Sequence, residues 1–226
     1  MTYSNIERAV FLSRPNRFIA YCRLAGGEEI RCHVKNTGRC RELLVPGCTV
    51  LLEKSQNPNR STLYDLIAVY KGERLINMDS TAPNRAAAEL LPQLYEGCTF
   101  FRSEYQWGDS RFDFYLERGD ERRLIEVKGV TLEADGHTRF PDAPTLRGLK
   151  HVEELIAARG QGIAATLLFV IQMKGVVDFS PNDETQPAFR EALCRAREAG
   201  VELIAYDCTV TENSMTIRSP VPILLQ

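Results

Sequence analysis

The hydrophobic and polar positions of residues 11–80 alternate in short runs that are separated by turn residues. Such alternation, bounded by Gly, Pro, Asn or Asp, is typical of β-strands. The strands predicted in this way are 17–24, 28–34, 48–54, 61–70 and 75–78. Five short strands so close together indicate a small all-β barrel, and an oligonucleotide-binding (OB) fold is the leading prediction. An SH3-like barrel fits the same pattern and stays open.

The pattern changes after residue 83. We expect a helix over 85–95 with Asn84 as its N-cap, followed by strands over 99–106, 111–117 and 122–127. The helices and strands that follow alternate over 145–159, 164–171, 187–199 and 201–206. This order predicts an α/β domain with a mixed sheet and flanking helices. The chain therefore divides into a barrel over residues 1–83 and an α/β domain over residues 84–226.

Three charged side chains are expected to gather on two neighbouring strands of the second domain. Asp113 lies in Arg-Phe-Asp-Phe, and Glu126 and Lys128 lie in Ile-Glu-Val-Lys-Gly one hairpin later. Because strand side chains alternate between faces, Glu126 and Lys128 share one face, and Asp113 meets them if the strands pair. Carboxylates are ligands for Mg²⁺ or Mn²⁺, and an ammonium group can assist the attacking water in phosphodiester hydrolysis. We therefore predict a metal site on Asp113 and Glu126, with Lys128 completing the catalytic set.

Two further charged residues accompany this set. Glu104, on the preceding strand, is predicted as an additional metal ligand, and Arg111, on the same strand face as Asp113, is predicted to contact nucleic acid. Charges of this kind also form cross-strand salt bridges on ordinary surface hairpins. Glu-x-Lys alone is a weak signal, so the surface hairpin stays open as an alternative.

Two basic segments are candidates for binding a polyanion. A loop of the barrel and the first turns of helix 145–159 each combine basic and small polar residues, which contact phosphates without reading sequence. The predicted contacts are Lys35, Asn36, Thr37, Arg39 and Arg41 in the loop, and Arg147, Lys150 and His151 in the helix. An ordinary turn and a solvated helix face are the respective alternatives.

The composition excludes several other classes of protein. The chain has 226 residues, no apolar run long enough to span a bilayer, and seven scattered cysteines without a Cys-x-x-Cys pair. A disulfide framework, a zinc site and a membrane partner are therefore not expected, and a reducing cytoplasm is the expected location. The net charge of −2 combines 12 − 8 = +4 over residues 1–83 with 16 − 22 = −6 over residues 84–226. This asymmetry is compatible with a polyanion-binding module beside a metal-binding one.

Several segments also resemble one known family in the same order along the chain. They are HVKNTGRCRELLVPG (33–47), SRFDFYLE (110–117), IEVKGVTL (125–132), FPDAPTLRGLKHVEEL (140–155) and AREAGVELIAY (196–206). The sequence is similar to the sugar fermentation stimulation protein A family. The resemblance implies an N-terminal OB-like domain, a C-terminal domain like the PD-(D/E)XK nucleases, DNA binding and a link to sugar-use genes. Asp113, Glu126 and Lys128 match the nuclease motif, with Phe112 in place of its Pro, and Gln172 is a weaker candidate.

Two functions follow from these observations. The first is a DNA-binding, metal-dependent nuclease with little sequence preference, for which RNA is a second possible substrate. The second is a non-catalytic, DNA-binding regulator of sugar (maltose-type) catabolism. The sequence leaves the presence of catalysis open, and it leaves the oligomeric state open, with a homo-oligomer compatible.

Overall fold

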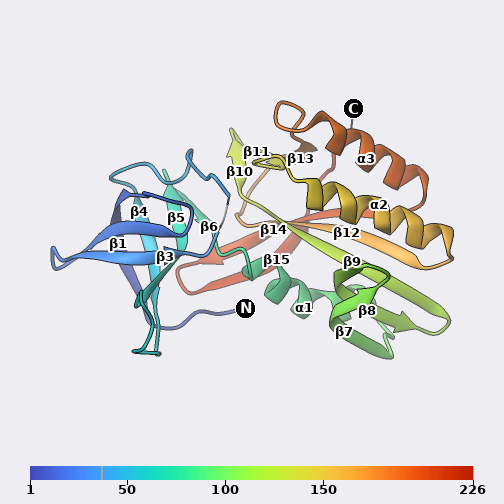
Figure 1. Ribbon diagram of the computed structural model, residues 1–226, viewed down its shortest axis with the longest axis horizontal. Helices are drawn as coiled ribbons and strands as arrows, with labels where there is room; N and C mark the ends of the chain where they lie inside the picture. The colour runs from blue at the N-terminus through green and yellow to red at the C-terminus, as the bar shows by residue number, and fades with distance from the viewer. Residues whose placement is uncertain (37, 226) are drawn as a thin grey trace.

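The computed structural model describes residues 1–36 and 38–225, with the N-terminal barrel at one end of the molecule and the larger mixed sheet at the other (Figure 1). The barrel strands lie in the order β3-β2-β1-β4-β5-β6, and an additional β3–β5 pairing closes the barrel. Five strands closed in this order form an OB barrel, as predicted. The six strands are β1 (Ile6–Ser13), β2 (Ile19–Leu24), β3 (Glu29–Val34), β4 (Thr49–Lys54), β5 (Tyr64–Lys71) and β6 (Arg74–Asn77).

Strand β1 was not predicted, although it lies at the centre of the barrel sheet. It pairs with β2 on one edge and with β4 on the other. Its sequence, IERAVFLS, has two charged residues directly after Ile6, and only Ala9 and Phe11 are fully buried. The alternation is therefore too weak to identify the strand without its neighbours.

The second sheet has the order β15-β14-β12-β9-β8-β7. Strands β9, β12 and β14 are parallel, and the outer pairs are antiparallel, so the prediction of a mixed sheet is confirmed. The strands are β7 (Phe100–Trp107), β8 (Ser110–Arg118), β9 (Glu121–Val130), β12 (Ala164–Ile171), β14 (Glu202–Thr211) and β15 (Ser214–Pro220). A small third sheet, which was not predicted, joins β10 (Leu132–Ala134), β11 (His137–Phe140) and β13 (Asp178–Pro181).

Helices cover both faces of the mixed sheet. Helices α2 (Leu146–Gly160) and α3 (Pro187–Glu198) lie together on one face, and α1 (Ala82–Leu94) lies on the other (Figure 1). All eight residues of β12 are buried between these layers, as the continuous apolar run predicts. Within the described ranges, none of the helices is long and apolar enough to cross a bilayer.

Helix α1 begins earlier than its sequence suggested. Thr81 occupies the N-cap position and Pro83 stands in the first turn, so the prediction of Asn84 as N-cap is wrong. Proline suits this position because the first backbone N–H groups of a helix have no intrahelical partner. Asn84 lies instead inside the helix, where its side chain is free to reach the sheet.

The barrel is joined to the mixed sheet by a buried polar junction. The side-chain amide of Gln172, at the end of β12, donates to the carbonyl groups of Asn77 and Asp79 and to the Asn77 side chain, at 3.0–3.2 Å. Apolar residues of β5 and of α1 belong to one buried cluster, so packing also crosses the junction. The division at residue 83 stays a prediction; it falls within the first turn of α1.

Gly129, beside this junction, is predicted to be intolerant of a side chain. A Cβ atom there would lie 2.5 Å from Gln172 Oε1 and 2.8 Å from the Pro83 ring. Because Gln172 is held by its hydrogen bonds, we expect Gly129→Ala to lower the free energy of unfolding by about 1–3 kcal/mol, measured by urea denaturation.

Gly26→Ala is the matched control for this experiment. No atom of residues 1–36 or 38–225 lies within 4 Å of a Cβ at Gly26, and its φ is not in the left-handed region. Its effect on the free energy of unfolding is expected to stay within about 0.5 kcal/mol. Equal stability of the two variants would contradict the tight packing that we describe at Gly129.

Candidate metal centre and nucleic-acid interface

The centre of the candidate site is the point where β8 and β9 separate. Their backbone pairing runs from Arg118 with Glu121 to Phe114 with Ile125 and would next join Asp113 to Glu126. At this point a side chain takes the place of the backbone hydrogen bonds between the two strands. Asp113 Oδ2 accepts a 2.7 Å hydrogen bond from the backbone N–H of Val127. Its Oδ1 accepts a second bond of 2.7 Å from the Asn84 side chain on α1. Both oxygens of Asp113 are therefore oriented by the fold.

The alternation of β8 is broken at Asp113. The Phe112 ring lies 6.0 Å from the His151 ring on the α2 side, whereas Phe114 stacks on Phe101 and packs in the buried cluster that contains α1. Residues two apart in a regular strand share a face, so the strand twists locally between these two rings. On the neighbouring strand, Glu104 stands opposite Asp113 and has a left-handed φ of 56°. The break allows the Asp113 carboxylate to lie between the strands.

Glu126 and Lys128 lie on the same face of β9, as predicted from their spacing. Lys128 Nζ donates to Glu126 Oε1 at 2.5 Å, and the same oxygen accepts a hydrogen bond from His151 Nδ1. The Glu126 side chain is only 4% exposed. Its second oxygen, Oε2, is buried and has no hydrogen-bond partner among the described residues. A buried carboxylate oxygen without a donor is costly, so this atom is suited to a cation.

His151 completes the site from α2. Thr145 caps this helix by accepting a bond from the Gly148 N–H, and the first turns then place His151 against Glu126. Arg147 Nε donates to His151 Nε2 at 3.4 Å, which leaves Nδ1 as the donor to Glu126. His151 was predicted to contact nucleic acid from the polar side of α2, but the helix packs against β9 at this position and His151 is buried. His151 holds Glu126 and does not face solvent.

The two carboxylates differ in their protonation equilibria. Burial, followed by the nearby charge of Glu126, raises the pKa of Asp113 to about 6. Burial alone would also raise the pKa of Glu126, but the His151 hydrogen bond and the Lys128 charge together lower it. The site therefore keeps Glu126 ionised and disfavours a second negative charge on Asp113. A divalent cation bound between the two carboxylates would offset the repulsion between their negative charges.

The donor set fits a hard divalent cation only in part. Asp113 and Glu126 offer carboxylate oxygens, which Mg²⁺ and Mn²⁺ prefer. Among the described residues, no group of three His, Cys, Asp or Glu side chains is arranged to hold a metal. Glu104 is more than half exposed and is paired with Arg111 at 2.7 Å, so the structure does not bring it to the other two carboxylates. Water or substrate oxygens would have to complete the coordination.

The remaining predicted residues form two groups: side chains that are bonded within the protein and side chains that are exposed to solvent. Lys35 forms an ion pair of 2.8 Å with the buried Asp79, and the Asn36 side chain accepts a bond from the Gly38 N–H, so both shape the barrel loop. Thr37 lies outside the described residues. The side chains that extend into solvent are Arg39, Arg41, Arg111, Arg147 and Lys150. Only this second group is placed to meet a ligand directly.

Two important residues were missed in the sequence. Asn84 looked like a helix cap but binds Asp113, and Arg14 donates to the carbonyl groups of Arg17, Asn36, Gly38 and Arg39. Arg14 therefore determines the shape of the loop that carries Arg39 and Arg41. No local pattern marks either role, because both depend on chain segments that lie far away in the sequence.

Two family models match this chain in succession. The SfsA N-terminal OB domain matches residues 12–78, and the Sugar fermentation stimulation protein RE domain matches residues 81–214. The chain belongs to the sugar fermentation stimulation protein family. The resemblance proposed from the sequence segments is thereby confirmed.

Relatives of the family cover the whole chain. A sugar fermentation stimulation protein homolog of Clostridium beijerinckii is 50% identical over 100% of both chains. One from Desulfitobacterium hafniense is 53% identical over 95% of this chain and 94% of its own. Among solved structures, Pyrococcus furiosus SfsA, described in complex with Ca²⁺, is 28% identical with a TM-score of 0.87 and covers 99% of this chain and 98% of that one. This likeness supports the two-part fold described above.

The raised pKa of Asp113 predicts a pH-dependent stability for the metal-free protein. The folded state binds the proton more tightly than the unfolded state does, so stability is lost as pH rises from about 4 to about 6. Asp113→Asn removes this titration. In EDTA, the wild type should lose free energy of unfolding between pH 5 and pH 8 relative to the variant. The difference between the two proteins should change by on the order of 1 kcal/mol, in favour of the variant at pH 8.

Urea denaturation at several pH values measures this difference. Asp109→Asn, in the exposed turn of the same hairpin, is the matched control and should follow the wild type. A constant difference between Asp113→Asn and the wild type from pH 5 to pH 8 would contradict the raised pKa.

Proposed function

We propose that this protein is a divalent-metal-dependent nuclease that hydrolyses phosphodiester bonds of nucleic acid, with little sequence preference, at Asp113, Glu126 and Lys128. The observation that carries the proposal is the buried Oε2 of Glu126, which has no hydrogen-bond partner among the described residues and lies beside the Asp113 carboxylate. Two adjacent carboxylates that resist simultaneous ionisation, with one oxygen free of donors, are suited to bind a cation.

The burial of these groups argues against an ordinary surface hairpin. Exposed cross-strand salt bridges need no burial and contribute little to stability. Here Glu126 is inside the protein and receives donors from two different elements, β9 and α2. Burying charges in this way costs desolvation, and apolar residues of similar volume are often at least as stable, so a ligand explains the arrangement better than stability alone.

The chain's own residues suggest a division of roles. Asp113 and Glu126 would hold Mg²⁺ or Mn²⁺, which supplies charge neutralisation at the phosphate and a more acidic water. Asn84 and the Val127 N–H fix the orientation of Asp113, and His151 fixes that of Glu126. Lys128 is placed to stabilise negative charge on the phosphate oxygens or to orient the attacking water.

Two further observations support the substrate and the cofactor. The Pyrococcus furiosus relative is described with Ca²⁺, which is a hard divalent cation like Mg²⁺. The exposed arginines of the barrel loop and of α2 offer contacts to phosphate that carry no base specificity. DNA is the proposed substrate, and RNA shares the same phosphate chemistry.

Metal binding provides the first test of this function. Titration calorimetry with Mn²⁺ should show a single site in the wild type, and Glu126→Gln and Asp113→Asn should each weaken it by at least about tenfold, because each removes a charged ligand. Asp109→Asn should leave the affinity unchanged. Heat signals that are identical in wild type and Glu126→Gln would contradict the site.

Glu104→Gln, measured in the same way, tests the third ligand predicted from the sequence. The ion pair with Arg111 leads us to expect little change. A loss as large as that of Glu126→Gln would place Glu104 in the metal site after all.

Cleavage tests the role of Lys128. Lys128→Met removes the ammonium group but no carboxylate, so Mn²⁺ affinity should be kept while the rate of cleavage of single- or double-stranded DNA or RNA falls by about 100-fold or more. If wild-type protein binds nucleic acid but cleaves none of these substrates with Mg²⁺ or Mn²⁺, the non-catalytic DNA-binding regulator becomes the better interpretation.

A further inference from the structure

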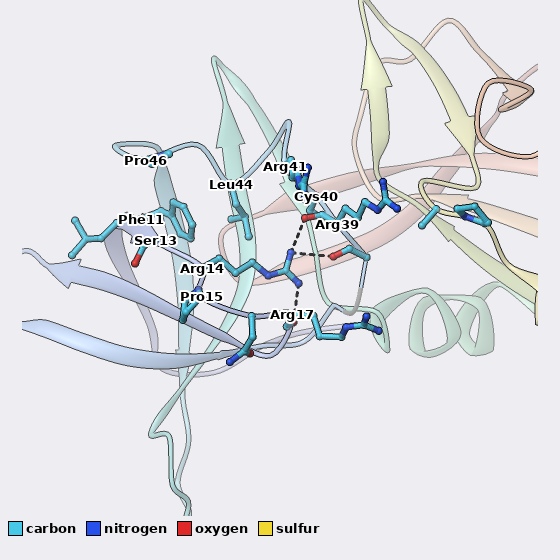
Figure 2. A pocket seen from close by; sticks show the side chains of 15 residues that line it. Phe11, Ser13, Arg14, Pro15, Arg17, Arg39, Cys40, Arg41, Leu44 and Pro46 are labelled. Atoms are coloured by element: carbon cyan, nitrogen blue, oxygen red, sulfur yellow. Dashed lines mark hydrogen bonds between the residues drawn. The ribbon is translucent and has the colours of Figure 1, made fainter.

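A groove on the surface lies where the barrel meets the segment that leads into α2. Its volume is about 750 Å³, and it is formed by barrel residues 11–17, 38–41, Leu44 and Pro46 together with Ala143 and Pro144 of the second domain (Figure 2). Pro144 immediately precedes Thr145, the cap of the helix that carries His151. The groove therefore joins the barrel to the helix that supports Glu126.

Positive charge is concentrated along this groove. Arg17, Arg39 and Arg41 line it, and all three are exposed. Among the residues that the structure describes, none of these three guanidinium groups has an acidic partner, whereas most other arginines of the barrel are paired. Unpaired guanidinium groups are donors for phosphate and can stack on the faces of bases. The groove is thus prepared for an anionic ligand.

Arg14 holds the backbone segments that line the groove. Its guanidinium group donates to four backbone carbonyls at 2.7–3.0 Å, and Figure 2 shows it pointing into the loop that these carbonyls form. On the other side, the backbone N–H of Arg39 donates to Asp142 Oδ2 at 3.2 Å, which ties the loop to the second domain. Arg14 and Asp142 are positioning residues, since their polar groups are occupied by the protein itself.

The walls between the arginines are apolar. Leu12, Leu44, Pro46 and Pro144 contribute this surface. A duplex presents phosphates and sugars to such a surface and keeps its bases stacked inside. A single strand presents both phosphates and unstacked bases, which need apolar contacts as well as charge.

We propose that this groove binds a single-stranded segment of nucleic acid, with Arg17, Arg39 and Arg41 on its phosphates and the apolar walls against its bases. The proposal rests on the nuclease function above and gives its substrate class: nucleic acid with a single-stranded region, delivered to the site along the 142–145 segment. The groove lies apart from the metal ligands, so binding there is measurable without metal.

Fluorescence anisotropy in EDTA tests the groove independently of cleavage. The probes are a DNA strand and an RNA strand of about 12 nucleotides, a blunt duplex of the same sequence, and the DNA strand with abasic sites in place of its bases. The proteins are the wild type, a triple variant with Arg17, Arg39 and Arg41 changed to alanine, and a matched control in which the exposed Arg102, Arg122 and Arg218 are changed instead.

We expect the wild type to bind both single strands at least tenfold more tightly than the duplex and the abasic strand. The triple variant should lose at least tenfold in single-strand affinity, with a weaker salt dependence by about 0.7 in slope for each lost phosphate contact. The control variant should remain within about twofold of the wild type, since removing charge far from the groove acts only at long range. Unchanged Mn²⁺ affinity in the triple variant would show that its metal site is intact.

Three results would overturn the proposal. They are equal affinity for duplex and single strand, equal affinity for the abasic and the intact strand, or an equal loss in the triple and the control variants. Failure of cleavage in the wild type would overturn the proposed function but would leave the binding result standing, so the two failures are distinguishable.

Discussion

The candidate site depends on the burial of two carboxylates beside each other. Neither Asp113 nor Glu126 can be fully ionised inside the protein without compensation, because both lose water and repel each other. The fold compensates from three directions, with Asn84 on α1, the Val127 N–H on β9 and His151 on α2. Two helices on opposite faces of the sheet thus stabilise one pair of side chains. Among the described residues, Glu126 Oε2 still lacks a hydrogen-bond donor.

A second constraint, the buried polar junction, positions the barrel relative to Asp113 and Glu126. Gln172 holds the end of β6, and Asp79 in turn holds Lys35 at the start of the barrel loop. Asp142, just before α2, binds the other end of the same loop. Because the loop is bound at both ends, to the buried Asp79 and to Asp142, these contacts position Arg39 and Arg41 relative to α2. Residues predicted as one basic patch therefore have two roles, with some building the loop and others facing the groove.

Most of the architecture was predictable because its local signals are strong. Strand β12 is a continuous apolar run, and α2 has helical spacing after a threonine cap. Strand β1 and the small β10–β11–β13 sheet were missed, because short or charged strands gain their stability from partners distant in sequence. Asn84 was misread as a cap since its residue type suits that position, while Pro83 and Thr81 moved the helix start upstream.

The sequence by itself determined that Glu126 and Lys128 share a face, because the two-residue period of a strand is a local property of the backbone. It also determined the order of the longer helices and strands after β1, and its segments indicated the family. Only the tertiary structure decided that His151 is buried against Glu126, that Asp113 accepts the Val127 N–H, and that Arg14 holds the loop while Arg39 and Arg41 remain open. These contacts join segments from about 14 to 25 residues apart, and their geometry arises from how strands diverge and helices pack, which no local periodicity encodes.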